Sequence, residues 1–191
     1  KIKYDGDYLS VSKADLKSNE LNTVSVSFTH PYSTTGSGLH RFEDPVDKNI
    51  YLYTDFEPYD ANEFIPCFDQ PDLRATYKLT VDTPRNWKVI SSVREGKIQS
   101  LPGDRAKWEF KKSDNFSTYI FSLHAGPYSV WTSRAGKIPL RLFARKSLAK
   151  YVEHREWFKI TRQGFKFFQN YFSYKYPFEK YDQIIVPDFN A

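Results

Sequence analysis

The sequence predicts a mainly β protein: an antiparallel β-sandwich, followed by the first elements of an α/β domain. Three observations carry this prediction. Several short segments alternate apolar and polar residues, which is typical of half-buried strands. Turn signals separate them, at 84–86, 102–104 and 126–127, and short strands at this spacing indicate a sandwich. After Arg145 the apolar residues recur every three or four positions, which indicates a helix.

The strictest alternation covers residues 22–30. Val24, Val26 and Phe28 would face one side of a strand there, and the serine and threonine residues between them the other side. Residues 77–82 alternate in the same way. Four further apolar-rich runs are predicted as strands: 87–93, 107–111, 119–124 and 138–144.

A helix is predicted over residues 147–172. Ser147 can cap its first turn, because a serine hydroxyl accepts a hydrogen bond from a free backbone N–H group. Pro177 lies just beyond its end, where prolines commonly follow helices. Residues 182–186 then read as a strand, which Pro187 closes.

This change of pattern predicts two domains. A length of 191 residues suffices for one domain and part of a second. A run of strands followed by a helix and another strand indicates a new unit. The sandwich domain would cover residues 1–129 and the beginning of the second domain residues 130–191, with the boundary near 126–136.

The amino-acid composition limits the kinds of partner and the cellular compartment that are expected. The net charge is +5, but the basic residues are scattered without a recognition motif, so no nucleic-acid partner is expected. No run of about 18 apolar residues is present, so no membrane partner is expected. The first residues lack the apolar run of a secretory signal. The single cysteine, Cys67, favours a reducing compartment, and a cytoplasmic location is expected.

Three stretches carry a family resemblance. Residues 56–77 combine three prolines, five acidic residues and one cysteine among aromatics, in the order Phe-Glu-Pro followed by Pro-Cys-Phe-Asp-Gln-Pro. Residues 38–42 read Gly-Leu-His-Arg-Phe and precede an Asp-Pro pair, and residues 186–191 read Val-Pro-Asp-Phe-Asn-Ala. Together they resemble the M1 family of zinc aminopeptidases, the relatives of aminopeptidase N.

The resemblance implies a saddle-like antiparallel β-sandwich as the N-terminal domain, followed by the first α/β elements of a thermolysin-like catalytic domain. It implies that the chain stops just before the family's Gly-Ala-Met-Glu-Asn motif. The whole protein would use one zinc ion to remove N-terminal residues from peptides with a free N-terminus. Its catalytic residues and zinc ligands would all lie in the rest of its own catalytic domain, so this chain alone would be inactive.

The same resemblance implies four substrate-binding residues. Glu57 matches the family's residue that binds the free α-amino group of the substrate, and a fixed carboxylate is a natural partner for an ammonium. Asp55 stands where many relatives have glutamine, and an acidic wall would favour a basic side chain. Asn190 and Ala191 lead into the segment that pairs with the substrate backbone. The alternative for Glu57 is a solvated carboxylate at a strand end.

The remaining residues of 66–71 are interpreted as scaffolding. Cys67 has no histidine beside it in the sequence and lies between a proline and a phenylalanine, which favours an inert, buried thiol. The two prolines, Pro66 and Pro71, restrict the backbone around them. Asp69 is expected to hold the loop by accepting backbone N–H groups.

No zinc site is expected within this chain. Its four histidines are His30, His40, His124 and His154, and no His-Glu-x-x-His motif occurs. The sequence Glu-His-Arg-Glu at 153–156 lacks the second histidine. A different class of function stays open: a non-catalytic β-sandwich interaction or scaffold module, in which Glu57 is an ordinary surface carboxylate.

Overall fold

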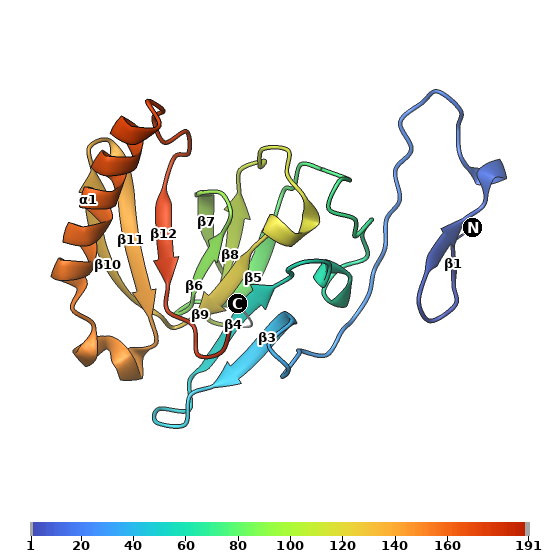
Figure 1. Ribbon diagram of the computed structural model, residues 1–191. Helices are drawn as coiled ribbons and strands as arrows, with labels where there is room; N and C mark the ends of the chain where they lie inside the picture. The colour runs from blue at the N-terminus through green and yellow to red at the C-terminus, as the bar shows by residue number, and fades with distance from the viewer. Residues whose placement is uncertain (1, 190–191) are drawn as a thin grey trace.

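The computed structural model describes residues 2–189, and it divides into three visible parts (Figure 1). A β-sandwich occupies the middle of the view, a sheet covered by one helix lies on the left, and a hairpin with a long connecting arm extends to the right. No helix among the described residues is long and apolar enough to cross a membrane.

Two sheets form the sandwich. The four-stranded sheet has the order β3-β4-β9-β6, and the three-stranded sheet the order β5-β8-β7. Every strand pair in the two sheets is antiparallel. The strands are β3 (Gly38–Glu43), β4 (Ile50–Asp55), β5 (Thr80–Pro84), β6 (Lys88–Ser91), β7 (Glu95–Leu101), β8 (Arg105–Phe110) and β9 (Leu123–Gly126).

The four-stranded sheet is the middle layer of the molecule. On one face, Leu52, Val89 and Leu123 pack against Trp108 and the rest of the β5-β8-β7 sheet. On the other face, Tyr51, Ile90 and Tyr128 pack against Phe143 of the left-hand sheet. Successive residues of a strand point to opposite faces, so β4 is buried almost continuously rather than alternately.

The left-hand part is a second three-stranded sheet, ordered β10-β11-β12. The strand β10 (Ser129–Ala135) pairs antiparallel with β11 (Ile138–Ala144), whereas β12 (Tyr181–Ile184) pairs parallel with β11. A parallel pair needs a long crossover, and the helix α1 (His154–Tyr171) supplies it. Phe158 of α1 packs on Leu140 and Leu142 of β11 to form the core of this part.

The predicted strand at 22–30 is wrong. Residues 21–32 form no helix or strand, and Val24, Val26 and Phe28 are all exposed. Alternation makes a strand only where a neighbour takes up the backbone N–H and C=O groups, and no described strand pairs with this segment. The arm connects the β-hairpin of β1 (Ile2–Tyr4) and β2 (Leu9–Val11) to the sandwich.

Most other strand predictions are confirmed with shifted ends. The prediction for 138–144 coincides with β11, those for 87–93 and 107–111 correspond to β6 and β8, and that for 182–186 to β12. The predicted strand at 77–82 begins as β5 only at Thr80. The predicted strand at 119–124 is split into a 3₁₀ turn, Thr118–Ile120, and β9.

The helix prediction is confirmed in kind but wrong at its start. Residues Lys146–Tyr151 form a 3₁₀ turn, and α1 begins only at His154. Ser147 does not cap the helix: its hydroxyl donates a hydrogen bond of 2.5 Å to Oδ2 of Asp44. The hydrogen bond from the hydroxyl to a buried, ionised carboxylate is stronger than one between the hydroxyl and a solvated N–H group at a helix end.

Candidate functional site

The strand β4 presents the candidate site at its C-terminal end. Asp55 is the last residue of β4, is half-buried, and lies opposite Gly38 of β3. The next residue, Phe56, is 2% exposed, and its ring lies 5.8 Å from that of Phe64 and 6.2 Å from that of Phe121. The buried phenylalanine therefore anchors the backbone from which Glu57 projects.

Glu57 is exposed, and its carboxylate has no hydrogen-bond or ion-pair partner among residues 2–189. Its backbone N–H donates to Oδ1 of Asp55 at 3.4 Å, which connects the two acidic residues. The peptide bond between Glu57 and Pro58 is cis. A free carboxylate on an anchored backbone is available to accept hydrogen bonds from a cationic ligand.

Asp69 holds the loop that follows, as the sequence predicted. Its Oδ2 accepts the backbone N–H and the side-chain Nδ2–H of Asn62, both at 2.9 Å, and its Oδ1 accepts the hydroxyl of Thr118 at 2.6 Å. Burial alone would raise the pKa of Asp69, but these hydrogen bonds stabilise the carboxylate and hold the pKa below its usual value. The loop is thus clamped to the sandwich beside the candidate site.

Cys67 contributes packing to the same loop. It is half-buried against the core of the sandwich. Burial, and then the neighbouring Asp69, raise the pKa of the thiol to about 11. Thiolate is therefore scarce near neutral pH, which agrees with the interpretation of an inert cysteine.

The segment after β12 returns to β4, as the red end of the chain in Figure 1 shows. The N–H of Ile185 donates to the carbonyl of Phe143 at 2.9 Å. Three residues later, the N–H of Asp188 donates to the hydroxyl of Tyr53 at 3.3 Å. The structure thus brings residues 185–189 beside β4, while Asn190 and Ala191 lie outside the described residues.

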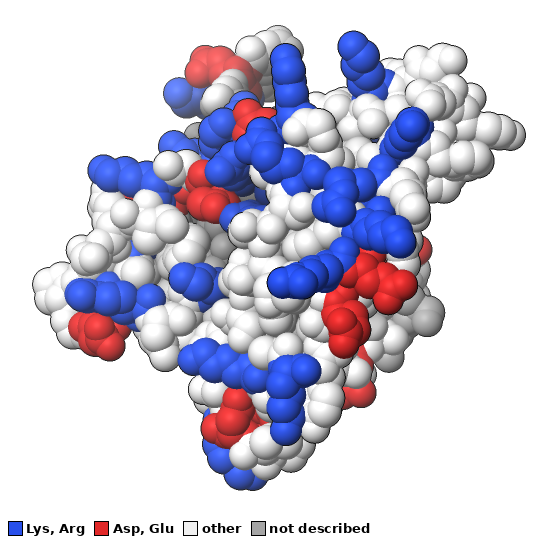
Figure 2. Space-filling view, turned by 90° about the vertical axis from the view of Figure 1, so that its left-hand side faces the viewer, with Lys and Arg blue, Asp and Glu red and all other residues white. Residues whose placement is uncertain are grey.

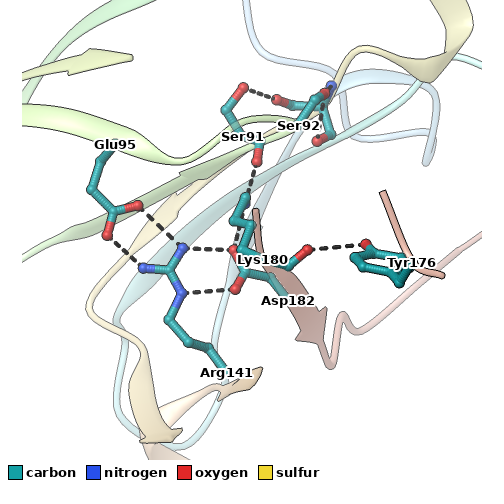
Figure 3. A network of polar contacts seen from close by, with 8 residues as sticks. Ser91, Ser92, Glu95, Arg141, Tyr176, Lys180 and Asp182 are labelled. Atoms are coloured by element: carbon teal, nitrogen blue, oxygen red, sulfur yellow. Dashed lines mark hydrogen bonds and ion pairs between the residues drawn. The ribbon is translucent and has the colours of Figure 1, made fainter. Parts of the chain in front are cut away.

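A network of charges joins the left-hand sheet to the sandwich (Figure 3). Arg141 of β11 donates two hydrogen bonds of 2.7 Å to Asp182 of β12, and two more, of 2.6 and 3.1 Å, to Glu95 of β7. Lys180 donates to Asp182 at 2.5 Å and to the carbonyl of Ser91 in β6 at 2.6 Å. Two cations therefore meet two carboxylates, so the cluster carries no net charge.

Burial would by itself raise the pKa of Asp182. The hydrogen bonds from Arg141 and the charge of Lys180 outweigh burial and hold the pKa of Asp182 below its usual value. Asp182 therefore stays ionised at neutral pH and fixes β12 against β11 and the sandwich. Because β12 leads directly into residues 185–189, this network sets where that segment meets β4.

The histidines do not form a zinc site. Nδ1 of His40 accepts the N–H of Gly36 at 2.9 Å, and the ring of His154 stacks on Trp131 with a centroid distance of 5.5 Å. Within residues 2–189, no group of three or more His, Cys, Asp or Glu side chains is arranged to hold a metal ion. The residues present therefore do not fit a zinc site.

Figure 2 shows the face that lies on the left of Figure 1. Lys and Arg side chains are numerous on this face, but Asp and Glu side chains and uncharged surface lie between them. The charge is therefore mixed on the face that the view presents.

Sequence reasoning missed Tyr53 and the Arg141 network. Tyr53 is fully buried and looks like a core residue, and its contact with Asp188 spans 135 positions. Arg141 and Glu95 are likewise 46 positions apart. No local pattern marks such pairs, because they depend on which sheets pack together.

The comparisons with known proteins agree with the fold. The model of the peptidase M1 N-terminal domain matches residues 1–120. Aminopeptidase N of Streptomyces lividans is 46% identical over 164 residues, which are 84% of this chain and 19% of that protein. Glutamyl aminopeptidase of Rattus norvegicus is 36% identical over 151 residues, 78% of this chain and 16% of that protein.

Residues 1–120, which include most of the antiparallel sandwich, thus match the N-terminal domain of a peptidase family. The chain belongs to the M1 peptidase family. It spans less than a fifth of the length of the relatives named above.

Proposed function

We propose that the protein containing this chain is a zinc-dependent aminopeptidase that removes N-terminal residues from peptides. The observation that carries the proposal is the Glu57 carboxylate, which is exposed, free of partners among the described residues, and projects from an anchored strand end. Membership of the M1 family and the names of the relatives support the class of reaction. In this proposal the chain binds substrate and holds none of the catalytic residues.

Glu57 accepts hydrogen bonds from the free α-ammonium group of the substrate. Asp55, tied to the Glu57 backbone, forms part of the wall that contacts the first side chain and favours a basic one. Asn190 and Ala191, which follow residues 185–189 in the sequence, contribute to binding of the substrate. The zinc ion binds in the remainder of the protein, since the histidines of this chain do not fit it.

We also propose that residues 1–129 are the N-terminal domain and that 130–191 begin the catalytic domain. The exposed side of α1 supports this division. A groove of about 960 Å³ runs along it, and its lining is mostly apolar: Trp157, Ile160, Phe165, Phe168, Phe172 and Tyr176 are among the residues. An exposed apolar surface of this size indicates contact with another domain or protein. The relatives are more than four times as long as this chain, and we propose that the remainder of the catalytic domain covers the groove.

A cytoplasmic location completes the proposal. It rests on the single cysteine, whose thiol needs no oxidising compartment and is held protonated by burial.

The test is Glu57→Gln in the full-length protein, measured with one peptide that has a free N-terminus and the same peptide acetylated. A hydrogen bond to a charged group contributes about 1.5–3 kcal/mol, so kcat/KM for the free peptide should fall about ten- to 150-fold. The acetylated peptide should be a poor substrate of both proteins, with little further change.

Asp72→Asn is the matched control. Asp72 is also exposed and belongs to the same acidic stretch, so its removal takes away one negative charge without touching the proposed site. It should leave kcat/KM for both peptides within about twofold, the scale of a surface substitution. Equal losses for free and acetylated peptides in Glu57→Gln would make Glu57 a structural residue and overturn the assignment.

A further inference from the structure

Tyr53 is the one residue of β4 that hydrogen-bonds to the segment after β12, within the chain that the structure describes. Its hydroxyl accepts the N–H of Asp188 at 3.3 Å. Tyr53 lies two positions before Asp55 and four before Glu57 on the same chain segment. Asp188 lies two positions before Asn190. One side chain therefore spans the two segments that supply the proposed substrate-binding residues.

The Tyr53 side chain lies between the positions of two histidines on the neighbouring strands. In the four-stranded sheet it lies directly opposite His40 of β3 and directly opposite His124 of β9, so all three side chains share one face. The His40 ring lies 4.9 Å from the Tyr53 ring, centroid to centroid. Tyr53 is fully buried, and burial raises the pKa of its hydroxyl, which keeps the group neutral. A neutral hydroxyl on an immobilised ring is a fixed acceptor.

The same strand offers a matched comparison. Tyr51 shares the face of Tyr53, is also fully buried, and its hydroxyl accepts the N–H of Lys146 at 3.0 Å. Both tyrosines thus receive one backbone N–H from the left-hand part of the molecule. They differ in the segment that they bind. Tyr51 holds the 3₁₀ turn after β11, whereas Tyr53 holds the segment that precedes Asn190 in the sequence.

We propose that Tyr53 is a positioning residue for the substrate site, which holds residues 185–189 at a set distance from the strand end that carries Glu57. The inference rests on the function proposed above. Tyr53 does not touch the substrate. It acts by keeping the two segments at a fixed spacing, so that the Glu57 carboxylate and residues 185–189 contact one bound peptide together.

The first experiment uses the 191-residue chain. In Tyr53→Phe, hydrogen exchange at the Asp188 amide should become faster, while exchange at the Lys146 amide stays unchanged. In Tyr51→Phe the pattern should reverse. Unchanged exchange at Asp188 in Tyr53→Phe would show that the hydrogen bond does not hold the segment, and would overturn the proposal.

The second experiment measures KM and kcat of the full-length protein with a free-amine peptide. Each variant loses one hydroxyl acceptor, so both should lose similar thermal stability. Tyr53→Phe alone should raise KM, by about two- to tenfold, which is the range for one net hydrogen bond, with kcat changed less. Asp188→Pro removes the donor instead of the acceptor and should raise KM in the same way.

The third experiment combines Tyr53→Phe with Glu57→Gln. Because Tyr53 acts by holding residues 185–189 at a fixed spacing from Glu57, its effect should be smaller once Glu57 is replaced, and the rise in KM of the double variant should be less than the two single rises combined. Additive effects would overturn the positioning role, as would equal KM values for Tyr51→Phe and Tyr53→Phe. The proposed function itself is judged separately, by free and acetylated peptides with Glu57→Gln.

Discussion

Nη1 of Arg145 lies 2.7 Å from Oδ2 of Asp44, across 101 positions of sequence. The Asp44 side chain is completely buried, and that of Arg145 is 14% exposed. The guanidinium also lies 4.8 Å above the ring of Phe42. The pair joins the turn between β3 and β4 to the segment after β11, so it ties the left-hand part of the molecule to the sandwich.

The Asp44–Arg145 pair should be essential for stability. In Asp44→Asn the buried guanidinium loses its counter-charge, and breaking a buried pair from one side costs about 3–5 kcal/mol. The free energy of unfolding, measured by urea denaturation, should fall by that amount. Glu43→Gln is the control, because Glu43 pairs with Arg41 at the surface, 3.2 Å apart, and such pairs contribute about 1 kcal/mol or less. Similar losses in the two variants would contradict this prediction.

His124 should make the fold sensitive to mild acid. Burial, and then the charge of Lys180, lower the pKa of His124 to about 4, from a usual value of 6.5. Between these values the unfolded chain binds a proton that the folded chain does not, so the free energy of unfolding decreases as the pH falls from about 6.5 to 4. Below about pH 4 both states are protonated and this contribution no longer changes.

The measurement is the free energy of unfolding at several pH values for the wild type and for His124→Gln. The variant has no titrating group there, so the decrease between pH 6.5 and 4 should be smaller by up to about 3 kcal/mol. His30→Gln removes an exposed histidine and should keep the wild-type slope. A slope that is unaltered in His124→Gln would exclude His124 as its source.

Because of the exposed side of α1, this chain on its own should bind hydrophobic dyes and self-associate. Ile160 and Phe168 are 60% and 56% exposed and line the apolar groove. Ile160→Gln combined with Phe168→Gln should reduce the binding of a hydrophobic dye and the self-association seen by sedimentation. Each exposed substitution should change the free energy of unfolding by only about 0.5 kcal/mol.

Phe158→Gln is the contrast for that prediction. Phe158 is 3% exposed and packs on β11 in the core of the left-hand sheet. Its replacement should cost about 3 kcal/mol or more, because it leaves a cavity and buries an amide. If the groove variant binds as much dye as the wild type, the groove is not the source of the exposed apolar surface.

Metal analysis of this chain after dialysis should find well below one zinc per molecule. The nitrogen Nδ1 of His40 is occupied by a backbone N–H, and the ring of His154 is stacked on an indole. A stoichiometric zinc that is lost in His40→Ala or His154→Ala would prove the prediction wrong.

Much of the architecture could be predicted from local sequence. The strand predicted at 138–144 matched β11, because a short run rich in apolar residues is typical of a buried strand. The loop-holding role of Asp69 was predictable for a similar reason. A short acidic side chain between prolines finds backbone N–H donors within a few residues, and Asn62 is only seven positions away.

The failures came from partners that a local pattern does not contain. Residues 22–30 alternate as a strand should, yet they have no strand beside them in the described chain. Ser147 has the chemistry of a helix cap, but buried Asp44, 103 positions earlier, takes its hydroxyl. In both cases a longer-range contact, present or absent, outweighed the local preference.

The features of the candidate site can be separated in the same way, into those that local sequence determines and those that depend on long-range contacts. The sequence by itself determined the family, the acidic residues Asp55 and Glu57 as candidates, and the lack of a paired histidine motif. The buried strand β4 before Glu57 and the exposure of its carboxylate came only from the structure. Only the tertiary structure decided that Tyr53 meets Asp188 and that Arg141 binds Glu95 and Asp182 together. The reason is physical: alternation, capping and turn preferences act over a few residues. The pairing of distant side chains depends on which sheet faces bury their apolar surface against each other, and that is a property of the whole fold.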